Sequence, residues 1–206
     1  LLQIPLAILK CISILRRFKA DMVIGVGGYA AGPCIVAARI LRIPVGLLEQ
    51  NSVVGFTNRV SAALSNQVFT AFQETPLGLS ADKCLPTGNP TRSQLRPGIS
   101  KREQPFVVFA FGGSQGATGI NKLMVEAVGV LRDLKGSLQV IHQTGERDFE
   151  WVKKAYAEIG FQAEVHAFID DMQAMYDRCS VVVCRAGSST ISELGATRNA
   201  AVFVPF

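Results

Sequence analysis

Three glycine-rich turns contain the residues with which this sequence could do chemistry. They read GVGGYAAGP at 25–33, FGGSQG at 111–116 and CRAGSSTISE at 184–193. Each turn follows a short apolar run and precedes a helical pattern. Glycines at such a junction let backbone N–H groups point outward at the start of a helix, where the helix dipole attracts anions. The turns therefore predict phosphate binding, with a tight turn that serves only close packing as the alternative.

Hydroxyl and carboxyl side chains strengthen this prediction for the second and third turns. Ser114 can donate a hydrogen bond to a phosphate, and Glu193 can accept hydrogen bonds from two ribose hydroxyls. An ordinary capping arrangement accounts equally well for the third turn. In that arrangement Ser189 caps the helix and Ser192 or Glu193 bonds back to the chain.

The first turn also resembles a dinucleotide-binding signature. It approximates G-x-G-x-x-A, and Glu49 ends the next apolar run about twenty residues on. An NAD-dependent oxidoreductase that uses Gly25, Gly27 and Glu49 is therefore an alternative function.

The other polar residues indicate structural roles. We expect His142 and His166 to be core or strand-end residues, and Asp171 to cap a helix. The five cysteines include no C-x-x-C pair, which favours free thiols in a reducing cytoplasm. The absence of a D-x-D motif argues against a metal-bound nucleotide sugar, and we expect no metal or other cofactor.

The elements that must position these turns alternate between strands and helices. In the first half we expect helices at 6–20, 33–41 and 57–64, and strands at 21–26, 44–48, 67–72 and 83–86. In the second half we expect strands at 106–111, 138–142, 163–168, 180–184 and 200–204, and helices at 117–132, 147–159, 171–178 and 189–197. This alternation predicts parallel sheets with right-handed crossovers, which bind ligands at the carboxyl ends of their strands.

A polar, proline-rich stretch separates the two series. We therefore predict an α/β protein with two doubly wound, Rossmann-like domains at 1–90 and 105–206, joined by a linker at 91–104. The sequence starts without Met and stops just after a strand-like run. We expect it to be part of a longer protein.

The first predicted helix is amphipathic but too short to span a bilayer, which takes about 20 apolar residues. Ile8, Ile12 and Leu15 share its apolar face, and its basic residues include Lys10, Arg16 and Arg17. Because the whole chain has a net charge of +5, such a helix can dock on an anionic membrane. The alternative is a surface helix that packs on its own sheet.

Together the motifs GVGGYAAGP, LLEQN, GNPTR, FGGSQGA, HQTG, FIDDM and CRAGSSTISE, in this order, resemble the MurG family. The resemblance runs from about residue 5 to residue 206. It implies a GT-B fold, with the acceptor in the N-terminal domain and the UDP-sugar in the C-terminal domain. The implied reaction is inverting transfer of N-acetylglucosamine from UDP-N-acetylglucosamine to the C4 hydroxyl of the muramoyl-pentapeptide of lipid I (undecaprenyl-pyrophosphoryl-muramoyl-pentapeptide). Its product is lipid II for peptidoglycan synthesis.

The resemblance also implies which residues bind. The donor site would comprise Asn51, Arg92, Ser114, Ile169, Ser188, Ser189, Thr190, Ile191, Ser192 and Glu193. Acceptor or supporting roles would fall to Gly27, Gly28, Tyr29, Glu49, Asn58, Asn121 and Arg185. The implied location is the cytoplasmic face of the bacterial plasma membrane, as a peripheral protein that binds no nucleic acid.

Two departures from the family leave the catalytic base unassigned. Leu48 stands where the family usually has His, and the family's first glycine loop lies outside this sequence. The alternatives are another GT-B enzyme (a lipid glycosyltransferase or a UDP-N-acetylglucosamine epimerase), the oxidoreductase above, or a non-catalytic membrane-binding module.

Overall fold

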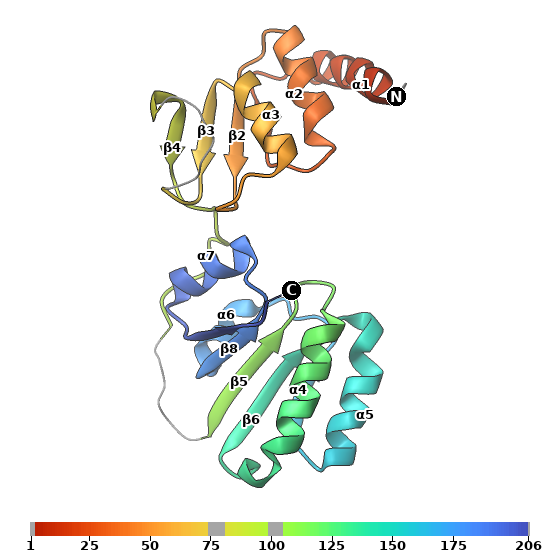
Figure 1. Ribbon diagram of the computed structural model, residues 1–206, viewed down its shortest axis with the longest axis vertical. Coiled ribbons are helices and arrows are strands. Elements are labelled where there is room, and N and C mark those ends of the chain that lie inside the picture. Colours follow the sequence, from red (N-terminus) through yellow and green to blue (C-terminus); the bar gives the residue numbers. More distant parts are fainter. Residues whose placement is uncertain (1–2, 74–80, 99–104, 206) are drawn as a thin grey trace. The chain divides into compact units, whose positions relative to one another are not determined.

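A computed structural model describes residues 3–73, 81–98 and 105–205. The chain forms two compact units, Leu1–Pro90 (unit 1) and Thr91–Phe206 (unit 2) (Figure 1). Each unit is built on its own parallel sheet. The predicted α/β class is therefore confirmed, and the predicted elements appear with ends shifted by only a few residues.

Unit 1 contains four parallel strands that follow one another in chain order. The sheet order is β1-β2-β3-β4. The elements are α1 (Gln3–Phe18), β1 (Val23–Gly25), α2 (Ala31–Ile40), β2 (Val45–Glu49), α3 (Phe56–Leu64), β3 (Gln67–Thr70), a 3-10 turn (Ala81–Lys83) and β4 (Cys84–Pro86). Because every right-handed crossover advances in the same direction, the helices collect on one face of the sheet.

The core of unit 1 lies between that face and the helices. Val23, Leu47 and Val68 point into it from the strands, where they meet buried residues of α1, α2 and α3. On the opposite face, Ile24 is 63% exposed and Leu85 is 49% exposed. The described part of unit 1 is thus the half of a Rossmann-like fold that winds in one direction.

Unit 2 is doubly wound. Its elements are β5 (Phe106–Phe111), α4 (Thr118–Val130), β6 (Leu138–Gln143), α5 (Phe149–Ile159), β7 (Ala163–His166), α6 (Met172–Arg178), β8 (Val181–Cys184), α7 (Ser188–Thr197) and β9 (Ala201–Phe203), with 3-10 turns at Arg132–Leu134 and Glu146–Asp148. The strand order is β7-β6-β5-β8-β9, all parallel. After β7 the chain returns to the other side of β5, so the winding reverses between β5 and β8.

This reversal places helices on both faces of the second sheet. Helices α4 and α5 cover one face, over a core that contains Ala110 and Val140. Helices α6 and α7 cover the other face, over Phe109 and Val182. In sheets of this kind, ligands bind beyond the carboxyl ends of the strands at the reversal point, here β5 and β8.

The expected linker at 91–104 is described as far as residue 98, and that part docks on unit 2. Leu95 packs against the core that α6 and α7 cover. The Arg96 N–H donates to Gln173 Oε1 over 2.9 Å, and the Gly98 N–H donates to the Thr197 carbonyl over 2.9 Å. These bonds hold the preceding residues, Arg92 among them, against unit 2.

Helix α1 corrects part of the membrane prediction. Leu15 is 8% exposed, and Ile8 and Ile12 pack beside it against the core of unit 1, so these three residues face the protein. A helical wheel identifies an apolar face but gives no sign of what covers it, and here α2 does. Lys10, Arg16 and Arg17 are exposed as expected. The apolar side chains of α1 that face solvent are Ile4, Leu6, Leu9, Ile14 and Phe18.

Candidate functional site

A pocket of unit 2 opens at the reversal point of the sheet, beyond the carboxyl ends of β5 and β8. Its volume is about 270 Å³, and it is lined by Arg92, Phe111, Gly113, Ser114, Gln143, Phe168, Ile169, Met172, Ser189, Thr190 and Glu193. Six of these residues were among those that the sequence assigned to a donor site: Arg92, Ser114, Ile169, Ser189, Thr190 and Glu193. The fold therefore brings together residues as far apart in the chain as Arg92 and Glu193.

The loop at 112–117 forms one wall of this pocket. Gly113 and Gly116 adopt the left-handed backbone region, with φ of 95° and 75°. A Cβ on Gly116 would lie 1.9 Å from the Thr144 carbonyl oxygen, and a Cβ on Gly145 would lie 2.2 Å from that of Gln115. Glycine is therefore required on both sides of this contact, because the backbones of the two loops touch each other.

The start of α7 forms a second wall. The N-cap residue is Gly187, which has no side chain to cap the helix. Ser189 and Thr190 lie in the first turn and line the pocket, whereas the Ser192 hydroxyl donates to the Ser188 carbonyl over 2.9 Å. The alternative interpretation, in which Ser189 caps the helix, is therefore wrong. Ser188, Ile191 and Ser192 belong to α7 but do not line the pocket.

Glu193 has a protein partner on each carboxylate oxygen. Arg92 Nε lies 3.4 Å from Oε1, and the Tyr176 hydroxyl donates to Oε2 over 3.0 Å. The Glu193 side chain is 14% exposed, at the edge of the pocket. A carboxylate held in this way keeps further acceptor sites for a ligand, because its two oxygens offer about four in total.

Gln143 joins two walls of the pocket and was missed by sequence reasoning. Its Nε2 donates to the Gly113 carbonyl over 3.0 Å, and its Oε1 accepts from the Ile169 N–H over 2.9 Å. The signal that could have found it is its position at the carboxyl end of β6, the strand beside β5. The pocket residues Phe168 and Met172 are the first and last residues of the motif FIDDM, from which the sequence analysis selected only Ile169.

Asn121 does not line the pocket but supports it through hydrogen bonds to the segment at 144–148. It is fully buried, and its Nδ2 donates to the Thr144 carbonyl and to Asp148 Oδ2, each over 2.9 Å. Its Oδ1 lies 3.1 Å from His142 Nε2, and the other ring nitrogen of His142 lies 2.8 Å from the Tyr156 hydroxyl. Burial lowers the pKa of His142 to about 4, so the ring is neutral at physiological pH.

The remaining polar residues of unit 2 lie outside the pocket. Arg185 donates to the carbonyls of Val204 and Pro205, just beyond β9. His166 ends β7 and contacts Glu164 over 2.8 Å. Asp171 accepts from the Ala174 N–H over 3.0 Å and so caps α6, as predicted. His142, described above, is the predicted core residue.

Unit 1 has a pocket of its own at the carboxyl ends of β1 and β2. Its lining includes Gly27, Gly28, Tyr29, Glu49, Asn51 and Asn58. Glu49 is fully buried, and its Oε1 accepts from the Asn51 N–H over 2.9 Å and from Asn51 Nδ2 over 3.3 Å. Its Oε2 accepts from Asn58 Nδ2 over 2.9 Å. A fully buried carboxylate does not suit the ribose-binding role of the NAD alternative.

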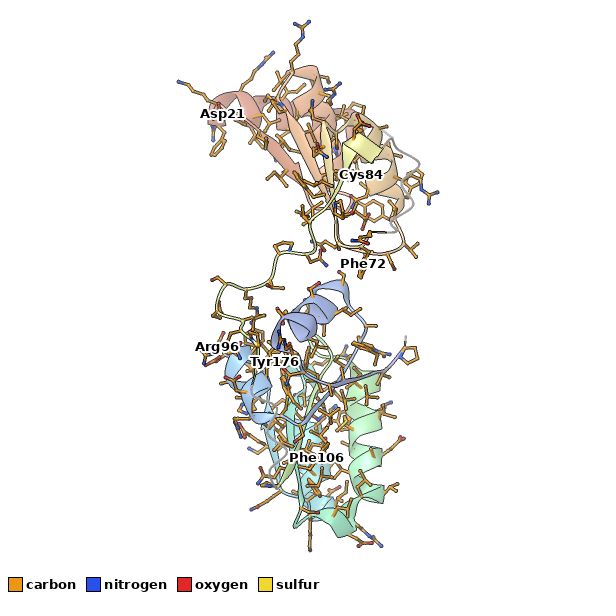
Figure 2. The ribbon with its side chains drawn as sticks, turned by 90° about the vertical axis from the view of Figure 1, so that its left-hand side faces the viewer. Asp21, Phe72, Cys84, Arg96, Phe106 and Tyr176 are labelled. Atoms are coloured by element: carbon orange, nitrogen blue, oxygen red, sulfur yellow. The ribbon has the colours of Figure 1, made fainter. Side chains whose placement is uncertain are left out.

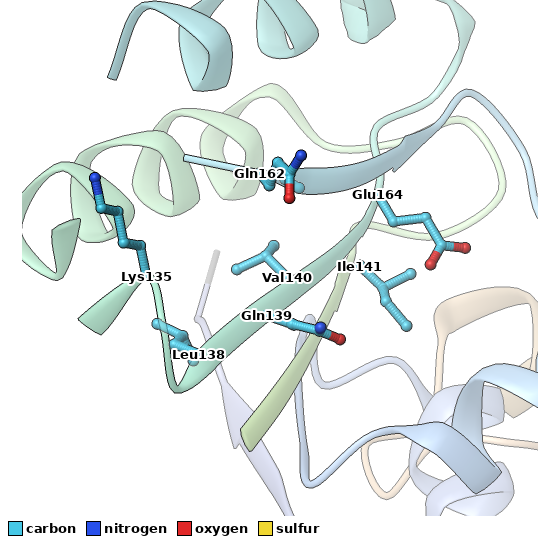
Figure 3. A pocket seen from close by; sticks show the side chains of 8 residues that line it. Lys135, Leu138, Gln139, Val140, Ile141, Gln162 and Glu164 are labelled. Atoms are coloured by element: carbon cyan, nitrogen blue, oxygen red, sulfur yellow. The ribbon is translucent and has the colours of Figure 1, made fainter. Parts of the chain in front are cut away.

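A larger cavity of about 400 Å³ lies at the start of β6 and β7 (Figure 3). Its lining includes Lys135, Gln139 and Glu164. No glycine loop and no helix N-terminus contributes to this lining, and it lies away from the carboxyl ends of the strands. The residues and elements that line the two pockets therefore favour the smaller one, at the reversal point, as the functional site.

Comparison with known proteins assigns the chain to a family. The Glycosyltransferase family 28 N-terminal domain matches residues 1–70, and the Glycosyltransferase family 28 C-terminal domain matches residues 107–206. The chain belongs to glycosyltransferase family 28. A family 28 relative from Myxococcus xanthus is 46% identical over 209 residues, which cover all of this chain and 55% of the relative. It is described as a UDP-N-acetylglucosamine–N-acetylmuramyl-(pentapeptide) pyrophosphoryl-undecaprenol N-acetylglucosamine transferase.

Other similar proteins support the same family assignment. A protein from Syntrophus aciditrophicus with the same description is 42% identical over all of this chain and 58% of its own length. The crystal structure of Acinetobacter baumannii MurG superposes with a TM-score of 0.75 at 34% identity, over all of this chain and 58% of that one. A Staphylococcus aureus MnaA–UDP structure, at a TM-score of 0.66 and 14% identity over 97% of this chain and 61% of that one, is similar in fold alone.

These findings confirm the GT-B fold and the predicted family resemblance. The chain spans about half the length of the curated relatives it matches.

Proposed function

We propose that this chain provides the donor-binding and part of the acceptor-binding machinery of an N-acetylglucosaminyltransferase that acts on a membrane-bound lipid pyrophosphate. The donor would be UDP-N-acetylglucosamine and the acceptor lipid I, as the names of the family 28 relatives state for those proteins. The observation that carries the proposal is the convergence of Arg92, Ser114 and Glu193 on one pocket of unit 2.

The chemistry of this pocket suits a uridine diphosphate sugar. Ser114, the glycine loop beside it and the start of α7 offer donors to the diphosphate, and the carboxylate of Glu193 accepts from ribose hydroxyls. The Ile169 N–H is already donated to Gln143, so the Ile169 backbone would offer a base only its carbonyl oxygen. Uracil fits this requirement because its N3–H is a donor.

The proposed reaction is a single displacement. The C4 hydroxyl of the acceptor attacks the anomeric carbon, the bond from that carbon to the UDP oxygen breaks, and the configuration inverts. Negative charge develops on the departing diphosphate. Backbone dipoles of the loop 112–117 and of α7, together with the Arg92 guanidinium, would stabilise this charge. The group that takes the hydroxyl proton is not assigned to any residue of this chain.

The pocket of unit 1 is the proposed acceptor-side surface. Gly27 and Gly28 adopt φ of 92° and 79°, which leaves a sharp turn beside the exposed ring of Tyr29. Asn51 lines this pocket, and Glu49 holds the Asn51 amide in place. Asn58 supports Glu49 from α3.

We further propose that α1 lies on an anionic membrane surface. Its outward face combines Leu6 and Leu9 with the basic residues Lys10 and Arg17. No described helix has the length and apolar character that crossing a bilayer requires. We propose a peripheral attachment at the cytoplasmic face of the plasma membrane, and sedimentation with lipid vesicles tests whether the chain binds a membrane.

Calorimetric titration of the full chain with UDP, UDP-N-acetylglucosamine and NAD tests the donor site. We expect binding of both uridine nucleotides and none of NAD. Glu193→Ala should weaken UDP binding about tenfold or more, because it removes hydrogen bonds to a charged group. The matched control is Glu158→Ala, an exposed carboxylate on α5. Binding of NAD, or equal UDP affinity in all three proteins, would contradict the proposal.

A further inference from the structure

We propose that Tyr176 is a positioning residue that orients the Glu193 carboxylate for recognition of ribose. This inference rests on the proposed function, because it concerns the uridine nucleotide that Glu193 would bind. Tyr176 lies on α6 and reaches Glu193 on α7 across 17 positions of sequence, with a hydroxyl-to-Oε2 distance of 3.0 Å. Figure 2 labels Tyr176 within unit 2.

The ring of Tyr176 is fixed by packing. The residue is 1% exposed and belongs to the core that α6 and α7 cover. Its ring meets the Phe109 ring edge to face, with 6.1 Å between the ring centres. A hydroxyl at the tip of such a ring has one available position, so its hydrogen bond sets the direction of the Glu193 carboxylate.

The backbones of α6 and α7 are tied together beside this contact. Asn199, just beyond α7, donates from Nδ2 to the Tyr176 carbonyl over 2.8 Å. Within α7, the Thr197 hydroxyl donates to the Glu193 carbonyl over 2.9 Å. The two partners of the Tyr176–Glu193 bond therefore stand in a common frame, and removal of the hydroxyl alone should not shift either helix.

The two partners of Glu193, Arg92 and Tyr176, differ in how exposed their side chains are. Arg92 approaches Oε1 from a segment without regular structure, and its side chain is 45% exposed. An exposed ion pair is weak and readily exchanged for a ligand. Tyr176 holds Oε2 from inside the core. Burial and the nearby Glu193 charge raise the pKa of Tyr176, so the phenol stays protonated at physiological pH and remains a donor.

With Oε2 anchored, the carboxylate cannot rotate away from the pocket. Two protein partners use two of its roughly four acceptor sites and leave two for a pair of vicinal hydroxyls. A ligand that lacks one of these hydroxyls should gain less from the fixed orientation. The inference therefore predicts an effect of Tyr176 on discrimination between ribose and deoxyribose, beyond any effect on stability.

The test compares UDP with 2′-deoxy-UDP by calorimetry in the full chain. We expect the unchanged chain to prefer UDP by about tenfold. Tyr176→Phe keeps the ring and should weaken UDP binding roughly fivefold, with little change for 2′-deoxy-UDP, so that the preference falls toward one. Tyr156→Phe is the matched control, since it removes another buried hydroxyl of unit 2, one that contacts His142 instead of Glu193. It should leave the preference unchanged.

The outcomes separate the inference from the proposed function. Normal UDP affinity and preference in Tyr176→Phe would overturn the inference and leave the proposed function standing. Equal weakening of both nucleotides would show a merely structural role and would also overturn it. Equal binding of the two nucleotides by the unchanged chain would contradict the role of Glu193 in ribose recognition. It would therefore overturn the inference as well. Failure of the unchanged chain to bind UDP at all would overturn the proposed function first.

Discussion

His142 shows how a polar side chain can sit in the core without a catalytic role. The ring is fully buried between the Tyr156 hydroxyl and Asn121 Oδ1, and burial lowers its pKa to about 4. Protonation would give both ring nitrogens a proton to donate, inside a low-dielectric core. Folding therefore favours the neutral ring, and the unfolded chain binds the proton more readily.

This difference predicts a pH dependence of stability. The lowered pKa means that the contribution of neutral His142 is fully present above about pH 6.5 and is lost as the pH falls toward 4. Between pH 6.5 and 4.5 the free energy of unfolding of unit 2 should fall by about 2–3 kcal/mol. Urea titrations followed by fluorescence of Trp151, the single tryptophan and part of the same core, measure it.

Two variants show whether His142 is responsible. His142→Gln should flatten the dependence, whereas His166→Gln should keep it. Glu164, whose pKa the Arg178 guanidinium lowers to about 2, stays ionised in the folded state throughout this window, whereas the unfolded chain begins to protonate it near pH 4.5. Its contribution to the change is therefore less than about half a kcal/mol, at the lower end of the window. A flat profile in the unchanged chain would show that the ring is not buried as described.

At the residue scale, the sequence predicted the side chains that carry motifs and missed those that act through distant contacts. Ser114 and Glu193 stand next to glycine turns, where residue type and spacing indicate phosphate and ribose chemistry. Gln143 and Tyr176 act on partners 26–30 and 17 positions away. Such pairs follow from the strand order and from how α6 packs beside α7, and neither leaves a local pattern.

The loops at 112–117 and 144–145 lead to a prediction at the scale of elements. Gly116→Ala would place a Cβ 1.9 Å from the Thr144 carbonyl oxygen at a φ of 75°. We expect it to abolish UDP binding and to lower the free energy of unfolding of unit 2 by more than about 3 kcal/mol. Urea titration followed by Trp151 fluorescence, together with calorimetry, measures both effects.

Gly129→Ala is the matched control for this substitution. Gly129 lies inside α4 with nothing near its would-be Cβ, so alanine should stabilise the helix by up to about 1 kcal/mol. It should not change UDP binding. Wild-type affinity in Gly116→Ala would show that the two loops can separate without loss of the site.

Helices and strands were largely predictable, whereas their surroundings were not. Strand β5 has its predicted bounds, because six apolar residues end at a glycine pair. The apolar face of α1 was also found, but a wheel cannot distinguish a lipid surface from α2. The segment at 91–98 has a linker composition, yet hydrogen bonds to Gln173 and Thr197 fix it on unit 2. Periodicity describes an element and leaves its neighbours undetermined.

For the whole molecule, the net charge of +5 and the outward face of α1 predict association with anionic vesicles. Leu9→Ser should weaken sedimentation with such vesicles, because it removes an exposed apolar side chain. Arg17→Gln should weaken it about fivefold, since a basic residue near the surface contributes about 1 kcal/mol. Added salt should reduce binding of the unchanged chain.

Val130→Ser is the control, as an exposed apolar residue of α4 in unit 2. Binding that is indifferent to Leu9, to Arg17 and to the lipid charge would contradict the membrane proposal. Leu15→Ala should instead lower the stability of unit 1, because that side chain is buried.

The doubly wound α/β class was predictable at this scale because alternating strands and helices allow few topologies. The GT-B fold was implied by the family resemblance. The position at which the winding reverses was not predictable. Nothing in the sequence shows that the chain, after β7, returns to the far side of β5 and places β8 there. That reversal determines which glycine turns share a pocket.

The direct contact between the backbones at 115–116 and 144–145 has a thermodynamic consequence. A loop held by its own main chain is already ordered before a ligand arrives, so little conformational entropy is lost on binding. A diphosphate that binds to the loop at 112–117 would then lose little free energy to ordering of the loop. A mutation that frees the loop would weaken binding mainly by making the entropy of binding less favourable, even with every polar contact intact.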